Sequence, residues 1–468
     1  MIPMTLRELA AATGARLTPP SAGDVLVDGP VVTDSREAAP GSLYVARVGE
    51  HADGHDFIAA ARDAGAVAAL TSHDTGDLPC LVVAGPAEVE PAFGRLARAV
   101  LDRAVAEHGL RVVAVTGSSG KTSTKDLLAQ VLATDGETVA PVGSLNGEVG
   151  VPLTVCRVSP TTRYLVAEMG ARGAGHLTYL TTIAPPDIAV ELNVGSAHLG
   201  EFGSRAAIAR AKAELVQALP PQGLAVLNAD DPAVLAMAAV TRARVVTVGL
   251  ADTADVRAAD VALDPLGRAS FTLVTSAGTA PVTLQVSGRH QVGNALAVAA
   301  AALDLGLTPA AVAAALSGAH AVSRWRMEVT ERPDGVTVVN DAYNANPESM
   351  RAALAALRAI ADASTPPRRT WAVLGEMLEL GPDAEQEHVG VGLEAARLGI
   401  DHVVAVGAGA RGIADGAGEA SRVTDGVDPA YDLLQAQLRP GDVVVLKSSR
   451  DAGLRWLGDR LAGVEVPS

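Results

Sequence analysis

The residue types best suited to chemistry stand in a glycine-rich loop that follows an apolar run. The run at residues 112–115 leads into Thr116-Gly117-Ser118-Ser119-Gly120-Lys121-Thr122-Ser123. Glycine lets backbone N–H groups close around phosphate oxygens, Lys121 would reach the outer phosphates, and the Thr122 hydroxyl would ligate Mg²⁺. Val115 occupies the first glycine position of the longer phosphate-loop pattern, so the shorter T-G-x-x-G-K-T form remains. The segment predicts a nucleotide-binding loop, with an ordinary strand-to-helix turn as the alternative.

Other polar side chains follow later predicted strands. Asn146 lies in a glycine-punctuated loop, Glu168 ends one apolar run, and His198 follows another. Ligands bind at the carboxyl ends of parallel strands, and a carboxylate there can hold Mg²⁺ beside phosphates. Lys212 comes next, on a predicted helix. Taken singly, a loop histidine is more often a surface or capping residue, and Lys212 could be only a helix neighbour of Glu214.

The order of apolar and helical stretches predicts three α/β domains, at residues 1–105, 106–318 and 319–468. The central one alternates strand and helix, which implies right-handed crossovers and a doubly wound, mostly parallel sheet. Stretches rich in threonine and valine between residues 255 and 286 predict antiparallel strands at its edge. The third domain is predicted to begin with two strands around a turn at residues 333–335. Strands and helices then alternate again, which predicts another parallel sheet.

Composition narrows the class of protein. Lys and Arg total 37 against 53 Asp and Glu in 468 residues, and the net charge of −16 opposes general nucleic-acid binding. Hydrophobic residues make up 49%, which favours a globular chain over a disordered one. Cys80 and Cys156 are too few for a disulfide framework, so we expect them buried and reduced. The apolar run at residues 295–303 is too short to span a membrane and no secretion signal is evident, so we expect a cytoplasmic protein.

Several segments, taken in chain order, carry a family resemblance. They read TGSSGKTS, SLNGEVGVPLT, AEMGARGAGHL, NVGSAHLGEFGS, AKAEL, NADD, GRHQVGNALA and NDAYNANPESM. Together they resemble the Mur ligase family, the ATP-dependent amide-forming enzymes of peptidoglycan assembly. The last segment resembles the member that adds D-alanyl-D-alanine to UDP-N-acetylmuramoyl-tripeptide. The Asp-Asn-Pro-Arg segment of the diaminopimelate- or lysine-adding member is not found in this sequence.

The resemblance implies a fold and a reaction. The fold would combine a small N-terminal UDP-binding domain, a central P-loop ATPase domain and a Rossmann-like C-terminal domain that binds the incoming dipeptide. A peptide carboxylate would attack the γ-phosphate of ATP, and the dipeptide amine would displace phosphate from the acyl phosphate. Both steps gather negative charge, which Lys121 and two Mg²⁺ ions would offset. The groups that would hold these ions are Thr122 and Glu168 for the first, and His198 and a carbamate on Lys212 for the second.

The resemblance also assigns residues to substrates and catalysis. Those that would bind the UDP-substrate are Asp34, Ser35, Arg36 and Asn146. Those at ATP, besides the phosphate loop, would be His290, Asn294, Arg326 and Asp341. Those near the dipeptide or the acyl centre would be Tyr343, Asn344 and Asn346, with Glu376 and His388 nearby in undefined roles. Those that would act on the reacting groups are Lys121, Asn146, His198, Lys212 and Arg326.

Alternatives stay open at this point. The implied partners are UDP-MurNAc-tripeptide and D-alanyl-D-alanine, and we expect a monomer that binds neither nucleic acid nor membrane. Another Mur-like ATP-dependent amino-acid ligase would share the ATP site, although folylpolyglutamate synthetases lack the UDP motifs. A non-catalytic P-loop regulatory protein is the second alternative. The sequence fixes neither the third residue of the tripeptide nor the carbamylation of Lys212.

Two local features carry further expectations. Ser448 stands where the family has glycine, so the backbone geometry of that loop is in question. Lys121 and Arg326 lie in different predicted domains but would serve one nucleotide. We therefore expect the second and third domains to close around ATP about a linker at residues 320–323.

Overall fold

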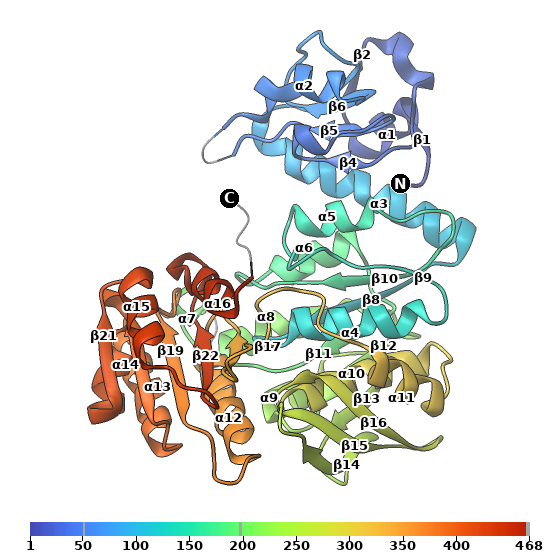
Figure 1. Ribbon diagram of the computed structural model, residues 1–468. Coiled ribbons are helices and arrows are strands. Elements are labelled where there is room, and N and C mark those ends of the chain that lie inside the picture. The colour runs from blue at the N-terminus through green and yellow to red at the C-terminus, as the bar shows by residue number, and fades with distance from the viewer. Residues whose placement is uncertain (50–51, 196–198, 465–468) are drawn as a thin grey trace.

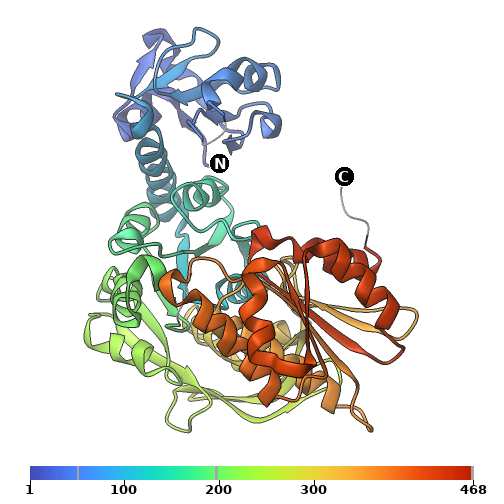
Figure 2. The same cartoon turned by 90° about the vertical axis from the view of Figure 1, so that its left-hand side faces the viewer.

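Figure 1 shows the computed structural model of the chain, which describes residues 1–49, 52–195 and 199–464. Three α/β bodies follow one another along the chain. The first stands apart, whereas the third lies against the second in both views (Figure 1 and Figure 2). None of the helices in these described ranges combines the length and apolar character that crossing a membrane requires.

The N-terminal body is a small sheet with helices packed around it. Its elements are β1 (Met4–Thr5), α1 (Leu6–Thr13), β2 (Arg16–Thr18), β3 (Leu26–Val27), β4 (Val31–Val32), β5 (Leu43–Val45), α2 (Ile58–Asp63), β6 (Ala68–Thr71), β7 (Cys80–Val82) and α3 (Val89–His108). The five-stranded sheet has the order β2-β7-β6-β5-β4, and only β2 is antiparallel to its neighbour. Buried side chains of α3 join one apolar core with residues of both the first and the central body. This helix therefore anchors the first body on the central one.

The central body is built on a nine-stranded sheet. Its strands are β8 (Arg111–Thr116), β9 (Glu137–Val139), β10 (Thr162–Glu168), β11 (Ile188–Glu191), β12 (Leu224–Asn228), β13 (Arg244–Gly249), β14 (Val256–Leu263), β15 (Arg268–Thr275) and β16 (Gly278–Ser287). The order is β16-β15-β14-β13-β12-β11-β8-β10-β9. Strands β8 to β14 pair in parallel, while β15 and β16 are antiparallel at the edge, as the sequence predicts.

Helices cover both faces of this sheet, which is why its middle strands are near-continuous apolar runs. The helices are α4 (Lys121–Ala133), α5 (Gly150–Val155), α6 (His176–Ile183), α7 (Leu199–Phe202), α8 (Arg205–Gln217), α9 (Pro232–Leu235), α10 (Gln291–Asp304) and α11 (Pro309–Gly318). One apolar core contains the buried faces of α4, α10 and α11, and the core on the other face contains those of α5, α6 and α8. Cys80 and Cys156 are buried and unpaired, as expected.

The third body has a six-stranded sheet in the order β17-β18-β22-β19-β20-β21. Its elements are β17 (Glu328–Glu331), β18 (Thr337–Asn340), α12 (Pro347–Asp362), β19 (Thr370–Gly375), α13 (Ala384–Arg397), β20 (His402–Val406), α14 (Arg411–Ala417), β21 (Ser421–Thr424), α15 (Val427–Gln437), β22 (Val443–Lys447) and α16 (Leu454–Ala462). β17 and β18 form the predicted hairpin, and the other strands are parallel. The linker before β17 lies on α4, where Asp126 Oδ2 accepts from the Ser323 N–H at 3.1 Å.

The α/β fold class predicted from the sequence is confirmed. Its central sheet is doubly wound and mostly parallel, and the strand ends on either side of the phosphate loop meet at one edge. The domain limits at residues 105/106 and 318/319 stay a prediction, beside the facts that α3 ends at His108 and α11 at Gly318.

Candidate active site

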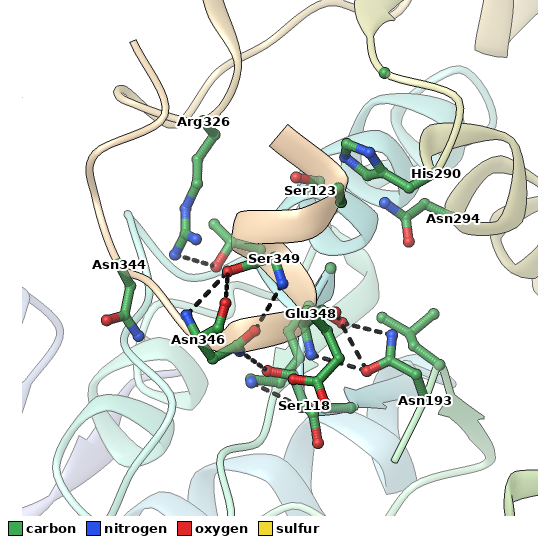
Figure 3. A pocket seen from close by; sticks show the side chains of 18 of the residues that line it. Ser118, Ser123, Asn193, His290, Asn294, Arg326, Asn344, Asn346, Glu348 and Ser349 are labelled. Carbon is green, nitrogen blue, oxygen red and sulfur yellow. Dashed lines mark hydrogen bonds between the residues drawn. The ribbon is translucent and has the colours of Figure 1, made fainter. Parts of the chain in front are cut away.

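A cavity of about 810 Å³ opens where the central and third bodies meet (Figure 3). It lies at the carboxyl ends of the central strands, the edge at which parallel sheets bind ligands. The cavity brings together most residues predicted from the sequence, namely Gly117, Ser118, Ser119, Gly120, Lys121, Thr122, Ser123, Asn146, Glu168, Lys212, His290, Asn294, Arg326, Asp341, Tyr343, Asn344 and Asn346. Residues that do not line it are Thr116, Asp34, Ser35 and Arg36. His198 lies outside the described residues.

The phosphate loop has the backbone that its glycine content predicts. φ is +82° at Gly120, and a Cβ there would meet the Asn294 Oδ1 at 2.7 Å. Asn193, just after β11, holds the loop from the side, since its Oδ1 accepts from the Ser119 N–H at 2.9 Å. α4 begins at Lys121, so the first free N–H groups of that helix lie at the loop. The segment is therefore shaped for an anion.

The side chain of Lys121 is folded back onto this loop. Its Nζ donates to the carbonyl oxygen of Gly117 at 2.8 Å. Burial lowers the pKa of the Lys121 ammonium, and the charge of Glu168 opposes that shift. A bound phosphate would add negative charge here and favour the ammonium form.

Glu168 ends β10 with one carboxylate oxygen engaged and one left over. Its Oε1 accepts from Nδ2 of Asn146 at 2.8 Å. Its buried Oε2 has no hydrogen-bond partner within residues 1–49, 52–195 and 199–464. Thr122 adds a buried hydroxyl to the same cavity. These oxygens are of the type that Mg²⁺ prefers, and the described residues contain no cluster of three or more His, Cys, Asp or Glu that could hold a metal ion.

Lys212, on α8, shares its buried place with a carboxylate that the sequence analysis did not single out. Glu191 ends β11 and is 1% exposed. Burial raises the pKa of the Glu191 carboxyl to about 8, while the Lys212 and Lys121 charges act to lower it. Burial also lowers the pKa of Lys212 to about 7, and the Lys121 charge adds to this. A glutamate closing the apolar run IAVE was the available sequence signal.

His290 and Asn294 lie at the start of α10, as predicted. The His290 ring packs over Gly288, where φ is +108° and a Cβ would clash with the imidazole. Burial lowers the pKa of His290, and the charge of Asp341 opposes this. Asn294 donates from Nδ2 to Oε1 of Gln291 at 2.8 Å. Across the cavity α12 presents the alanines Ala352, Ala355, Ala356 and Ala359, an apolar wall suited to a planar ring.

Arg326 reaches from the third body to the phosphate loop. Its Nη2 donates to the Thr122 Oγ1 at 3.4 Å, and its guanidinium lies 4.3 Å from the centre of the Tyr343 ring. The flanking residues Trp325 and Met327 have left-handed φ values of +58° and +52°. Such a conformation costs a non-glycine residue roughly 1–3 kcal/mol and is found where function needs it. This strained segment turns Arg326 into the cavity.

Asp341 is held within the third body by Lys447, a residue that the sequence analysis did not assign to the site. Lys447 ends β22, and its Nζ donates to Asp341 Oδ2 at 2.6 Å and to the carbonyl oxygen of Asn344 at 3.0 Å. The other oxygen of Asp341 accepts from the Met327 N–H at 3.0 Å. Asp341 thus orders the segment around Arg326, and its contact with ribose stays a prediction.

Asn346 caps α12 and docks that helix on the phosphate loop (Figure 3). Its Oδ1 accepts from the Ser349 N–H at 2.9 Å, and its Nδ2 donates to the Ser118 carbonyl oxygen at 3.4 Å. The hydroxyls of Tyr343 and Ser144 lie 2.5 Å apart, which ties the third body to the loop that carries Asn146. Substrate contacts of Tyr343, Asn344 and Asn346 stay predictions.

The structure shows where three residues lie whose roles the sequence analysis left open. Glu376 and His388 are not part of the cavity lining. His388 is buried, and its Nε2 accepts from the Met377 N–H at 2.9 Å, so it braces the loop after β19. Ser448 has no positive φ, and its Oγ donates to the Ser449 carbonyl oxygen at 2.9 Å. Serine therefore fits this turn where the family has glycine.

The residues predicted to bind the UDP-substrate lie in the first body. Asp34 caps the short 3₁₀ helix η2 (Ser35–Glu37) by accepting from the Arg36 N–H at 2.9 Å. Its Oδ2 also accepts from Arg36 Nη2 at 2.6 Å. These residues do not reach the cavity, so a substrate that joins the two places must be long.

Comparisons with known proteins decide the family. Residues 115–302 match the family described as Mur ligase middle domain, 325–450 match Mur ligase, glutamate ligase domain, and 30–106 match Mur ligase family, catalytic domain. The chain belongs to the Mur ligase family. As a Mur ligase it is an ATP-dependent ligase, and the family resemblance seen in the sequence is confirmed.

Individual Mur ligases resemble it over nearly their full length. The UDP-N-acetylmuramoyl-tripeptide--D-alanyl-D-alanine ligase of Mycobacterium tuberculosis is 50% identical, over 98% of both chains. The crystal structure of MurF from Acinetobacter baumannii has a TM-score of 0.88 at 31% identity, covering 98% of this chain and 99% of that one. MurF from Thermotoga maritima in complex with ADP has a TM-score of 0.81 at 28% identity, covering 93% and 98%.

Proposed function

We propose that this Mur ligase adds D-alanyl-D-alanine to UDP-N-acetylmuramoyl-tripeptide at the expense of ATP, in peptidoglycan precursor synthesis. The observation that carries the proposal is the cavity in which Lys121, Glu168 and Arg326 converge from two bodies. The 50% identity to the Mycobacterium tuberculosis ligase supports this choice of substrates. The ADP in the Thermotoga maritima neighbour supports ATP as the nucleotide.

The chemistry follows from the charges on the cavity wall. A carboxylate oxygen of the tripeptide attacks the γ-phosphorus of ATP, ADP leaves, and an acyl phosphate forms. The dipeptide amine then attacks the acyl carbon, phosphate leaves, and the nitrogen gives up a proton. Lys121 and Arg326 are placed to offset the negative charge that gathers on the phosphoryl oxygens. The docked third body would keep water from the acyl phosphate.

We assign two Mg²⁺ ions and a modified lysine to the phosphate end. Thr122 and Glu168 would hold one ion, and His198 with a carbamate on Lys212 would hold the other. Mg²⁺ bound there supplies charge neutralisation to the phosphate oxygens. The unpartnered Oε2 of Glu168 supports the first assignment. The lowered pKa of Lys212 supports the carbamate, because the neutral amine is the form that reacts with CO₂.

The remaining assignments place the substrates along the chain. Asp34, Ser35 and Arg36 would hold the UDP end on the first body, and Asn146 would meet the tripeptide near the phosphate. The adenosine would lie between α10 and α12, with His290 and Asn294 at the base and Asp341 at the ribose. Tyr343, Asn344 and Asn346 would border the dipeptide. The domains at 1–105, 106–318 and 319–468 would then bind the UDP-substrate, ATP and the dipeptide in turn.

Phosphate release by the purified full chain tests the function. We expect release from ATP and Mg²⁺ only when UDP-MurNAc-tripeptide and D-alanyl-D-alanine are both present, with amide product confirmed by mass spectrometry. Single amino acids in place of the dipeptide are the matched control and should give little product. Equal release with a single amino acid would instead indicate another Mur-like ligase. Nucleotide binding without product under any of these conditions would reject the enzyme assignment.

A further inference from the structure

Glu191 ends β11, whose other residues, 188–190, are apolar and buried. In register it pairs with Thr116 of β8 and Leu227 of β12. Side chains alternate across a strand, so Glu191 shares the sheet face of Ala189, whose core also contains buried residues of α8. Lys212 projects from that helix. The carboxylate therefore faces the layer that contains α8, the helix that carries Lys212.

The fold itself makes no use of this carboxylate. Neither oxygen of Glu191 has a hydrogen-bond partner in the part of the chain that the structure describes, although the residue is only 1% exposed. Buried polar groups are nearly always hydrogen-bonded, and one that is not destabilises the folded state. An apolar residue would suit this place better if folding were the only requirement. Glu191 therefore has the profile of a residue retained for the site rather than for stability.

The nitrogen of Lys212 is the group that can use these oxygens. Lys212 lines the cavity, whereas Glu191 does not. The charge of Lys212 is the largest influence opposing the raised pKa of the Glu191 carboxyl, so the two groups act on each other across the contact between α8 and β11. A carbamate has one N–H, and two oxygens on the far side of its carbon. If the N–H is directed to Glu191, the oxygens are directed to the phosphate end of the cavity.

We propose that Glu191 is a positioning residue for Lys212, whose N–H it accepts as a hydrogen bond so that the carbamate oxygens are aimed at the metal. The proposal rests on the function proposed above, which gives Lys212 its carbamate. Groups that ligate metals are commonly oriented in this way by a carboxylate behind them, and losing that carboxylate costs about 10–100-fold in activity or metal affinity.

The test compares two substitutions in the full chain. Glu191→Gln keeps an oxygen that accepts a hydrogen bond, whereas Glu191→Leu keeps a similar volume and removes it. We expect Glu191→Leu to lower kcat by about 10-fold or more at unchanged KM for ATP, and Glu191→Gln to lose much less. With ¹³C-bicarbonate, the carbamate resonance of Lys212 should weaken in Glu191→Leu and persist in Glu191→Gln. The melting temperature of Glu191→Leu should equal or exceed that of the wild type.

A Glu191→Leu chain that loses activity without losing melting temperature indicates a positioning role, because a structural role would lower both. Tyr164→Phe, at the other end of β10, is the control: it removes a hydroxyl that donates to Asp135 Oδ2, so it should lower the melting temperature while leaving kcat and the carbamate resonance unchanged. A Glu191→Leu chain with wild-type kcat and carbamate resonance would overturn the inference. So would a fall in melting temperature that parallels the loss of activity in both variants. A wild type that makes no product rejects the proposed function, whereas an active wild type with no carbamate resonance rejects this inference and the carbamate on Lys212 but leaves the ligase reaction in place.

Discussion

The central and third bodies each place a buried lysine at the candidate active site together with a buried carboxylate, and the two carboxylates differ in how many of their oxygens accept hydrogen bonds. In the third body Lys447 donates to Asp341 and to the Asn344 carbonyl, and both oxygens of Asp341 are engaged. In the central body Glu191 has no hydrogen-bond partner among the described residues, beside a Lys212 whose pKa burial depresses. The hydrogen bonds of Asp341 are therefore complete without a ligand. The oxygens of Glu191 can still accept hydrogen bonds.

The difference teaches how each body contributes to the site. A buried ion pair with every donor and acceptor used holds one geometry, here the strained segment around Arg326. A buried carboxylate whose oxygens accept no hydrogen bond adds little to the stability of the folded chain, and it can still interact with a bound charged group. We infer that the third body contributes fixed geometry and the central body contributes the reactive electrostatics.

Lys121→Ala should have the largest effect on the central side. The ammonium acts on charge that develops in phosphoryl transfer and is not part of an apolar core, so folding should be preserved. We expect turnover to fall by about 10³-fold or more, measured as phosphate release with both substrates. Circular dichroism and melting temperature should match the wild type. Phosphate release near the wild-type rate from a folded Lys121→Ala chain would contradict the assignment of the loop.

Lys212→Ala should come next, with a loss of about 100-fold in turnover because a metal-ligating oxygen disappears. Formate or acetate should restore part of the activity by supplying that oxygen. The measurement is turnover against carboxylate concentration, with Lys121→Ala as the control that carboxylates cannot rescue. Lys212→Ala activity that does not respond to any short carboxylate would count against a carbamate on this residue.

Lys447→Ala should act mainly on stability, in contrast to Lys212→Ala. Removing Lys447 leaves the Asp341 carboxylate buried without its cation, which costs roughly 3–5 kcal/mol of unfolding free energy. Chemical denaturation followed by circular dichroism measures this cost. Lys212→Ala should lose far less stability in the same experiment. Equal losses of unfolding free energy in Lys447→Ala and Lys212→Ala would contradict the proposed difference between the two lysines.

Much of this arrangement could be predicted from the sequence. The phosphate loop, the strand-end Glu168, and His290 at the start of α10 have local patterns, because glycine spacing and apolar runs determine where a parallel sheet presents its ends. Glu191 and Lys447 also close apolar runs, but the lysine or carboxylate that each one faces comes from a distant segment, so the run alone does not predict their roles. Asn346 looked like a substrate contact, but the structure first gives it a capping role, which the following Pro347 and Ser349 could have indicated.

The pH dependence of the unfolding free energy should report the raised pKa of the Glu191 carboxyl. In the folded chain the Glu191 carboxyl has a pKa of about 8, above its ordinary value of 4.5. Between these values the folded chain keeps a proton that the unfolded chain has lost, so stability from this group falls as pH rises. We therefore expect the stability advantage of Glu191→Leu over the wild type to grow from pH 5 to pH 8. Melting temperatures at both pH values measure it, and an advantage that shrinks over this range would contradict the raised pKa.

The smallest effect concerns the contact that joins the two bodies, between the hydroxyls of Ser144 and Tyr343 at 2.5 Å. A hydrogen bond of this kind contributes about 0.5–1.5 kcal/mol, so Ser144→Ala and Tyr343→Phe should each lower kcat/KM for the dipeptide roughly 2- to 10-fold. Tyr343→Phe keeps the ring that packs under Arg326, so the loss isolates the hydroxyl.

The double variant decides whether that contact is made during catalysis. If closure about residues 320–323 brings the two hydroxyls together around ATP, Ser144→Ala with Tyr343→Phe should be no worse than either single change. Small-angle scattering should then show a smaller radius of gyration with substrates and an ATP analogue than without them in the wild type, and a weaker contraction in the double variant. Losses that simply multiply, with equal contraction in both proteins, would mean that the bodies close without this contact. The contacts of Arg326 with Thr122 and of Asn346 with Ser118 would then hold the third body at the phosphate loop.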